Sequence, residues 1–378
     1  MNSSTPHHST QHRRLTQHRA TPVRPKKYSL QARATAKAGQ WLNSIPRPLL
    51  RLLPTVENSS GDRLDSQIAL SLKVLGWLEK LGGGGFTELP LDEGRALIDD
   101  EALMGGGRPE KVGSAREYRV DGVRVREYRP AGVAMDAKLP TLIYLHGGGW
   151  VLGSLDSHDA TARYLCNRVG AAVLSVDYRL APENPYPAGL DDVLTIIDAA
   201  QRGRIDGVDT ERIAVGGDSA GGNLTAAACL RLRDEGKPQP VLQVLFVPVT
   251  DLTRLDRPSY EEFADGYFLT AEQMRWYIDH YTPDPEMREQ PYASPLLAED
   301  LSGLAPAYVA VDGFDPLRDE GEEYARRLTA AGVPTTLRRH GELVHPFVNS
   351  LGVWPNARRA LDEAVGALRL ALQAGGAV

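Results

Sequence analysis

The sequence predicts an α/β protein in which helices cover both faces of a mostly parallel, eight-stranded sheet. From residue 141 onwards, short apolar runs alternate with segments of helical spacing, a pattern typical of parallel strands joined by helices. Ahead of them, the strand-like runs 117–120 and 123–128 flank Asp121-Gly122, a strong signal for a hairpin. The 378-residue chain is 42% hydrophobic and can therefore bury a large core.

The N-terminal region is predicted to have two parts. Residues 1–39 are expected to be a disordered basic tail, because 1–28 contain almost nothing apolar. Residues 40–105 are expected to form cap helices, with helical spacing over 64–81 and a shorter helix at 90–104. The stretch 40–54 combines Leu and Trp with two arginines. It fits either an anionic membrane surface or a helix packed on the body, and its two internal prolines favour packing.

The remaining residues, 106–378, are predicted to be one catalytic domain. Strands are expected at 141–145, 172–176, 213–215, 241–246, 307–311 and 335–339, and helices at 158–169, 188–202, 219–235, 317–331 and 355–373. The aromatic-rich segment 250–300 breaks the alternation, and we interpret it as a cap insertion over the active site.

Charge and composition exclude several function classes. Ten Lys and Arg and no acidic residue precede Glu57, which leaves 33 basic and 49 acidic residues in 57–378. An acidic body argues against nucleic acid as substrate. The only cysteines, Cys166 and Cys229, lie in apolar or helical surroundings and are predicted to be buried free thiols. No run of 18 apolar residues and no signal peptide is visible, so we expect a cytoplasmic protein, with peripheral membrane contact through the basic N-terminus left open.

The most informative motif is Gly217-Asp218-Ser219-Ala220-Gly221, which follows the apolar run 213–215 and precedes a helix of small residues. This G-x-S-x-G pattern in a strand–turn–helix context is a nucleophile elbow, in which a strained turn exposes the serine hydroxyl. The alternative is a glycine-rich turn with Ser219 as a helix cap. The second motif makes this alternative the weaker one.

That second motif is His146-Gly147-Gly148-Gly149 at the end of another strand. Consecutive glycine amides there are typical of an oxyanion loop, which stabilises the charge that develops during acyl transfer. A phosphate-binding loop would need a following Lys-Ser or Lys-Thr pair, which the sequence lacks.

A serine nucleophile needs a base held by an acid, in the chain order Ser, Asp or Glu, His. His345 lies between the last strand and the last helix, where such a base belongs, and is preferred over His280 and His340. Asp315 lies in the turn after the strand 307–311 and is preferred over Asp312 and Asp319 as the acid.

Five motifs in order resemble those of the bacterial hormone-sensitive-lipase-like carboxylesterases, especially the actinobacterial members. They are HGGGW at 146–150, DYRLAPE at 177–183, GDSAGGNL at 217–224, SPLL at 294–297 and DPLRDEG at 315–321. The resemblance covers about residues 110–375, with a looser match over 40–105. It implies an α/β-hydrolase fold with a helical cap.

The resemblance also implies residue roles. Ser219 would be the nucleophile, Asp315 the orienting acid and His345 the base. The oxyanion donors would be the amides of Gly148, Gly149 and Ala220. The family usually has His-Gly-Phe where this chain has His345-Pro346-Phe347, which gives a stiffer loop after the base.

The expected activity is hydrolysis of short- to medium-chain acyl esters through an acyl-enzyme intermediate. Aromatic residues of the loop and the insertion, with Trp150, Tyr267 and Phe268 first among them, are expected to line the substrate pocket. The expected partner is a small-molecule ester, with no cofactor, no metal and no nucleic acid, and homodimerisation is left open. Amide deacetylation by the same site and ligand binding without catalysis are the alternatives; the presence of His345 disfavours the second.

Overall fold

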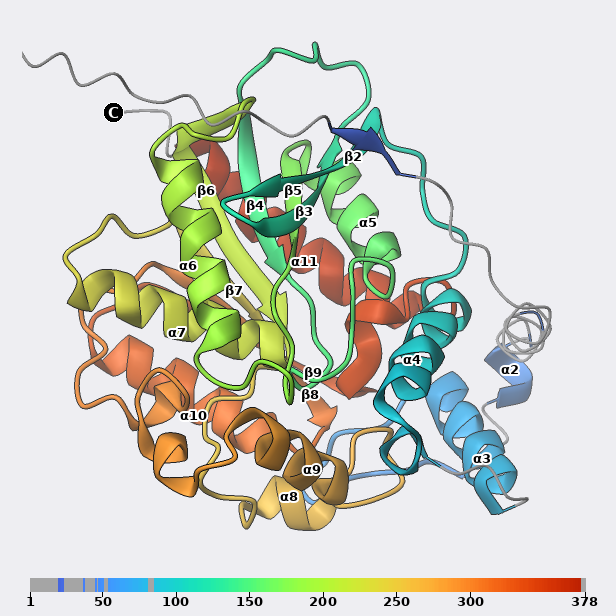
Figure 1. The fold of residues 1–378 in the computed structure, drawn as a ribbon. Coiled ribbons are helices and arrows are strands. Elements are labelled where there is room, and N and C mark those ends of the chain that lie inside the picture. The colour runs from blue at the N-terminus through green and yellow to red at the C-terminus, as the bar shows by residue number, and fades with distance from the viewer. Residues whose placement is uncertain are drawn as a thin grey trace, which may run out of the picture.

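One sheet runs through the centre of the molecule, with helices on either side of it (Figure 1). The structure, a computed structural model, describes residues 20–23, 37, 45, 47–50, 54–80 and 85–374. Its strands are β1 (Thr21–Pro22), β2 (Ser114–Val120), β3 (Val123–Arg129), β4 (Leu139–Leu145), β5 (Ala172–Asp177), β6 (Val208–Asp218), β7 (Leu242–Phe246), β8 (Ala307–Phe314) and β9 (Thr335–Val344). Strands β4 to β9 pair in parallel, whereas β1, β2 and β3 are antiparallel to their neighbours. The predicted α/β class is confirmed.

The strand order is β1-β2-β3-β5-β4-β6-β7-β8-β9, so the described residues form nine strands and not the eight predicted. The additional strand is β1, in which Thr21 pairs with Glu117 and Pro22 with Arg116. This corrects the prediction that the whole of 1–28 lacks structure. An edge strand offers unpaired backbone groups to any extended segment nearby, and Pro22 is tolerated because an outermost strand needs no donor on its free side.

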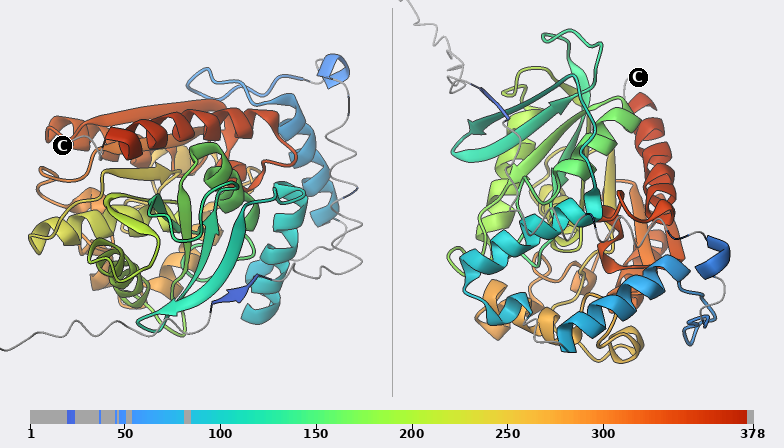
Figure 2. Two further views of the ribbon diagram at one scale, coloured as in Figure 1. Left: turned by 90° about the horizontal axis from the view of Figure 1, so that it is seen from above. Right: turned by 90° about the vertical axis from the view of Figure 1, so that its right-hand side faces the viewer.

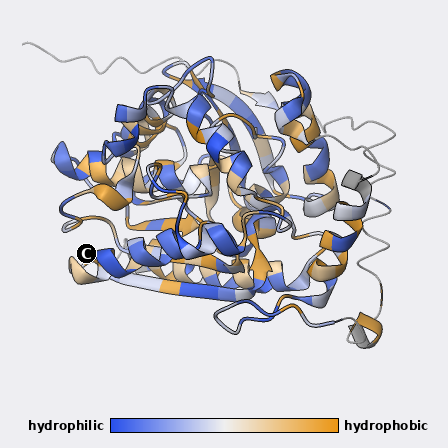
Figure 3. Cartoon of the chain, turned by 90° about the horizontal axis from the view of Figure 1, so that it is seen from below, coloured by the Kyte–Doolittle hydropathy of each residue, from blue (hydrophilic) through white to orange (hydrophobic). Residues whose placement is uncertain are grey.

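Helices cover both faces of the sheet. They are α5 (Asp159–Val169), α6 (Ala188–Gln201), α7 (Ala220–Asp234), α10 (Arg318–Ala330) and α11 (Pro355–Ala374), with bounds close to those predicted. Helices α5 and α11 pack in one apolar cluster with Tyr144 and Phe246, whereas α6 and the start of α7 pack in another with Ile143 and Val215. Figure 3 shows hydrophilic and hydrophobic residues interspersed along α11. Leu361, Leu368 and other apolar residues of this helix are buried, whereas its charged residues are exposed, as in an amphipathic helix.

The predicted cysteine state is confirmed. Cys166 of α5 and Cys229 of α7 are both free and buried. Burial raises the pKa of each thiol to about 12, which keeps both in the unreactive thiol form at neutral pH.

Four further helices lie beyond the carboxyl ends of the central strands (Figures 1 and 2). They are α3 (Ser66–Lys80), α4 (Leu91–Gly106), α8 (Pro258–Glu262) and α9 (Ala271–Tyr281), and a short α2 (Arg47–Leu50) lies beside α3. The segment before α3 is tied to the sheet, because Asn58 Nδ2 donates to Gly313 O over 2.9 Å and Asp65 N donates to Glu342 O over 3.0 Å. Most of the predicted tail 1–39 and much of 40–54 lie outside the described residues.

Within the described ranges, no helix is both long enough and apolar enough to cross a bilayer.

Candidate active site

The nucleophile elbow joins β6 to α7. Ser219 has φ 56° and ψ −116°, a strained conformation for a residue with a side chain, and its amide donates to Phe246 O over 2.8 Å. The turn fits only because its neighbours are small: a Cβ on Gly217 would come within 2.3 Å of Leu145 O, and one on Gly221 within 2.0 Å of the same atom. The glycines therefore let strand, turn and helix approach closely enough to expose the hydroxyl.

The three residues expected to form a triad lie in hydrogen-bonding contact. His345 Nε2 is 3.0 Å from Ser219 Oγ, and His345 Nδ1 is 2.9 Å from Asp315 Oδ2. Asp315 follows β8 directly and is fully buried, while its Oδ1 accepts the Leu317 amide over 2.9 Å. This is the geometry in which an imidazole can take a proton from a serine while a carboxylate fixes its tautomer.

The alternative acids lie elsewhere. Asp312 is fully buried among residues of β8 and β9, and neither of its oxygens has a partner in the described part of the chain. Burial, with the nearby Asp315 second, raises the pKa of Asp312 well above its usual range. Asp319 instead accepts the Ser259 amide over 2.9 Å and pairs with Arg318.

The two alternative bases, His280 and His340, also have neighbours other than Ser219. His280 on α9 has its Nδ1 2.7 Å from Trp276 O. His340 is buried on β9, where its ring lies 6.0 Å from that of Phe347. In the described residues neither histidine contacts Ser219.

The glycine loop after β4 reaches the same edge of the sheet. Gly148 has φ 116° and Gly149 has φ 59°, and a side chain on either would clash with Leu152 O or with the Tyr277 ring. Leu152 N donates to Gly148 O over 2.8 Å and closes the loop. Among residues 85–374, the amides of Gly148 and Gly149 donate to no other protein atom, so they are available to a ligand oxygen.

Aromatic residues from two segments far apart in the sequence cover this loop. The Tyr277 ring of α9 lies directly over Gly149, since a Cβ there would come within 2.1 Å of it. Phe86 stacks on Tyr277 with ring centroids 5.7 Å apart. A residue that precedes β2 and a residue of α9 therefore meet above the expected oxyanion donors. Neither Phe86 nor Tyr277 could be predicted from the sequence, because their role depends on contacts between distant segments.

The expected pocket residues have different surroundings. Trp150 is 1% exposed and stacks on Tyr281 with centroids 4.2 Å apart, so it packs in the core below the loop, in contrast to the expected place in a pocket wall. Tyr267 is half-buried and stacks on Phe314, next to Asp315, with centroids 5.6 Å apart. Phe268 is half-buried against Trp354.

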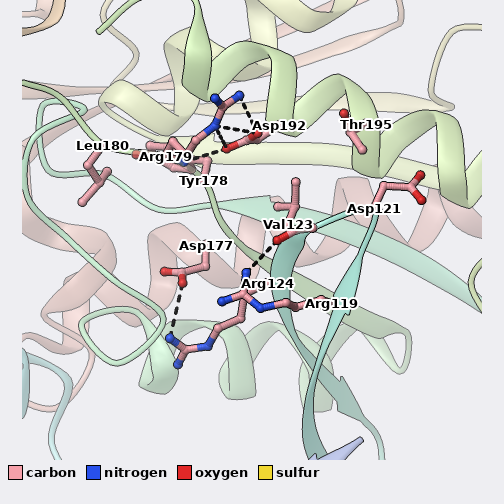
Figure 4. Close-up of a pocket in the computed structure, with 11 residues that line it drawn as sticks. Arg119, Asp121, Val123, Arg124, Asp177, Tyr178, Arg179, Leu180, Asp192 and Thr195 are labelled. Atoms are coloured by element: carbon pink, nitrogen blue, oxygen red, sulfur yellow. Dashed lines mark hydrogen bonds and ion pairs between the residues drawn. The ribbon is translucent and has the colours of Figure 1, made fainter. Parts of the chain in front are cut away.

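A separate polar cavity of about 640 Å³ lies between the β2–β3 hairpin, the segment after β5 and α6 (Figure 4). Its charges pair largely with one another: Arg124 with Asp177, and Arg179 with Asp192. None of the expected catalytic residues lines it. One lining residue, Tyr178, reaches the glycine loop, because its hydroxyl donates to His146 O over 2.8 Å.

Buried polar residues behind the elbow were not anticipated from the sequence. Asp218 precedes Ser219, and its Oδ1 accepts the Tyr144 hydroxyl over 2.6 Å. Its Oδ2 lies 3.1 Å from His158 Nε2. A histidine at the start of a predicted helix, twelve residues after the HGGG histidine, was the only available signal, and that spacing by itself does not predict a contact.

Comparison with known proteins identifies similar chains. The sequence profile of a family described as alpha/beta hydrolase fold matches residues 142–349. Carboxylic ester hydrolase LipN of Mycobacterium tuberculosis (strain ATCC 25618 / H37Rv) is 46% identical over 254 residues, which are 65% of this chain and 66% of LipN. Ethyl acetate hydrolase of Pseudomonas putida is 35% identical over 291 residues, 74% of this chain and 90% of that protein. The crystal structure of a thermostable esterase from Pseudomonas putida ECU1011 matches with a TM-score of 0.76 and 36% identity, over 82% of this chain and 98% of the esterase.

Proposed function

The chain belongs to the α/β hydrolase family, as a hormone-sensitive-lipase-like carboxylesterase of actinobacterial type, and we propose that it cleaves short- to medium-chain acyl esters through an acyl-enzyme on Ser219. Its relatives are carboxylic ester hydrolases and esterases, and carboxylic ester hydrolysis is accordingly its activity. The observation that carries the proposed mechanism is the 3.0 Å contact between Ser219 Oγ and His345 Nε2, backed by Asp315.

In the first half-reaction, Ser219 Oγ attacks the ester carbonyl carbon while His345 Nε2 takes the hydroxyl proton. The carbonyl oxygen becomes an oxyanion, which the amides of Gly148, Gly149 and Ala220 stabilise. The tetrahedral intermediate then collapses: the bond to the alcohol oxygen breaks, and His345 returns the proton to the leaving alcohol. An acyl ester on Ser219 remains.

In the second half-reaction, water attacks the acyl carbon and His345 takes one of its protons. A second oxyanion forms in the same place and collapses. The bond to Ser219 Oγ breaks, the proton returns to that oxygen, and the carboxylic acid leaves. Asp315 accepts a hydrogen bond from His345 Nδ1 and holds the imidazole in the tautomer with its proton on that nitrogen.

Short to medium acyl chains are proposed because cap residues lie close over the glycine loop. The Tyr277 ring covers Gly149, and Phe86 stacks above it. A relative named ethyl acetate hydrolase is consistent with small esters. The test is kcat/KM for p-nitrophenyl esters of increasing acyl length. We expect a maximum between about two and eight carbons. A maximum at palmitoyl, with activation at a lipid interface, would contradict the enclosed site.

We also propose a cytoplasmic location with peripheral membrane contact through the N-terminus. The support is electrostatic: ten Lys and Arg and no acid precede Glu57. Deleting residues 1–19 removes three of these charges and leaves the segment of β1 in place. At about 1 kcal/mol per basic residue, binding to anionic vesicles should weaken about 10²-fold, while hydrolysis of soluble esters stays unchanged. Equal vesicle binding by both chains would refute the contact.

A further inference from the structure

A buried histidine outside the expected triad lies where three loops of the site meet. His158 precedes α5 and is 2% exposed. Its Nε2 lies 3.1 Å from Asp218 Oδ2, 3.3 Å from the Gly147 amide nitrogen and 2.8 Å from the Asn349 side-chain amide. These three neighbours belong to the nucleophile turn, the glycine loop and the segment that follows His345.

Hydrogen-bond partners on the far side fix the orientation of the Asn349 amide. Thr161 has one hydroxyl proton, and its Oγ1 lies 2.9 Å from Val348 O, which can only accept. The same Oγ1 lies 3.0 Å from the Asn349 side-chain amide. Thr161 and His158 therefore hold the Asn349 amide from two sides.

The Gly147 amide donates to His158 Nε2 over 3.3 Å, and Asp218 Oδ2 and the Asn349 amide lie within hydrogen-bond distance of the same nitrogen. Ser157 Oγ lies 2.8 Å from Nδ1 and fixes the ring plane. Burial opposes charge on Asp218, but His158, by charge and hydrogen bond, and Tyr144, by hydrogen bond, hold the pKa of this carboxyl below its usual range. Asp218 is thus an ionised, fully engaged acceptor directly before Ser219.

We propose that His158 is a positioning residue whose Nε2 contacts Asp218, Gly147 and Asn349 and so fixes the nucleophile turn, the glycine loop and the base segment relative to one another. This inference rests on the proposed function of Ser219, His345 and the glycine loop.

The packing around the cluster leaves little room for movement. A Cβ on Gly147 would come within 2.3 Å of Asp218 Oδ2, so the carboxylate lies directly against the glycine loop. Asn349 ends the 3-10 helix η4 (His345–Asn349) that begins at the base. A shift at His158 therefore reaches all three loops together. Displacing reacting groups by about 1 Å can cost about 10²-fold in rate.

The test compares His158→Leu with His158→Gln in the full chain, using p-nitrophenyl butyrate. We expect kcat to fall about 10²-fold in His158→Leu with KM changed less than about threefold, because substrate binding does not use this group. Gln can place its side-chain amide near the position of Nε2, so His158→Gln should recover at least about tenfold of that loss. The inhibition constant of a trifluoromethyl ketone should rise by the factor by which kcat/KM falls, since this inhibitor mimics the tetrahedral state.

The matched control is Tyr164→Phe on the same helix. It removes the 2.7 Å hydrogen bond from Tyr164 to Asp362 and should lower Tm with kcat unchanged. If His158→Leu does not fold, His158→Gln and Asn349→Ala carry the test, the latter with an expected loss of about tenfold in kcat.

Two results would overturn the inference alone. The first is a wild-type kcat in the folded His158 or Asn349 variants. The second is a loss of kcat in Tyr164→Phe equal to the loss in His158→Leu. In both cases Ser219→Ala is inactive. Undiminished hydrolysis by Ser219→Ala would instead overturn the proposed function, and this inference with it.

Discussion

His146, the first residue of the glycine loop, gives a prediction about stability at acidic pH. Its ring is fully buried and stacks on Tyr178 with centroids 4.3 Å apart, while its Nδ1 lies 2.9 Å from Gly147 O. Its Nε2 has no partner within the described residues. Burial, with nearby His158 second, lowers the pKa of His146 from 6.5 to about 4. The folded protein therefore keeps this imidazole neutral where the unfolded chain protonates it.

The protonation of His146 in the unfolded chain makes the free energy of unfolding depend on pH. Between pH 6.5 and 4 the unfolded state binds more protons, so the free energy of unfolding falls as the pH falls through this window. A shift from 6.5 to about 4, at about 1.4 kcal/mol per pH unit, gives a total loss of about 3 kcal/mol. About 2 kcal/mol of this loss falls between pH 7 and pH 5.

The assay is urea unfolding at pH 7 and pH 5 for the wild type and for His146→Phe. Phenylalanine keeps an aromatic ring against Tyr178 but does not titrate. Burial raises the pKa values of acids such as Asp312 and Glu320. These acids are present in both proteins, so their contributions to the pH dependence of the free energy of unfolding cancel in the comparison. The wild type should lose about 2 kcal/mol more than the variant. Parallel losses would show that His146 is not held neutral by the fold.

Two further predictions concern the acid and the elbow. Asp315→Asn should lower kcat about 10⁴-fold by leaving His345 in the wrong tautomer, whereas Asp312→Asn should keep kcat within about tenfold of the wild type. If steady-state assays show a larger loss of kcat in Asp312→Asn than in Asp315→Asn, the acid is wrongly assigned. Gly221→Ala should lower the free energy of unfolding by about 3 kcal/mol, because its Cβ would lie 2.0 Å from Leu145 O. Gly366→Ala on α11, whose Cβ would have nothing within 4 Å, should raise the free energy of unfolding by about 0.5–1 kcal/mol. Equal effects of the two substitutions in urea titrations would refute the close approach at the elbow.

The parts of the fold that depend on local pattern could be predicted from the sequence. Helix α5 was expected at 158–169 and lies at Asp159–Val169, because its apolar spacing and its final glycine are local signals. The expected strand at 213–215 extends over Val208–Asp218, since β6 continues along β4 as far as the elbow. Strand β1 could not be predicted, because its two residues are held only by backbone pairing with the open edge of β2.

In the active site, too, an arrangement that follows from the strand pattern could be predicted, whereas contacts between distant side chains could not. The proximity of Ser219, Asp315 and His345 could be predicted because each follows a strand, and the carboxyl ends of parallel strands share one edge of the sheet. His158 could not be predicted, since its partners Asp218 and Asn349 are 60 and 191 residues away. Trp150 was expected to face substrate, but φ 59° and the stack on Tyr281 turn its ring into the core.

The central claim is that Ser219 forms the covalent intermediate, and covalent labelling tests it most directly. Wild type and Ser219→Ala are treated with diethyl p-nitrophenyl phosphate, which transfers a diethylphosphoryl group to an activated serine, and the intact and digested proteins are weighed by mass spectrometry. The account predicts one phosphoryl group per wild-type chain, located on Ser219, with complete loss of ester hydrolysis, and no label on Ser219→Ala. Labelling at another residue, or full esterase activity in the labelled enzyme, would contradict it.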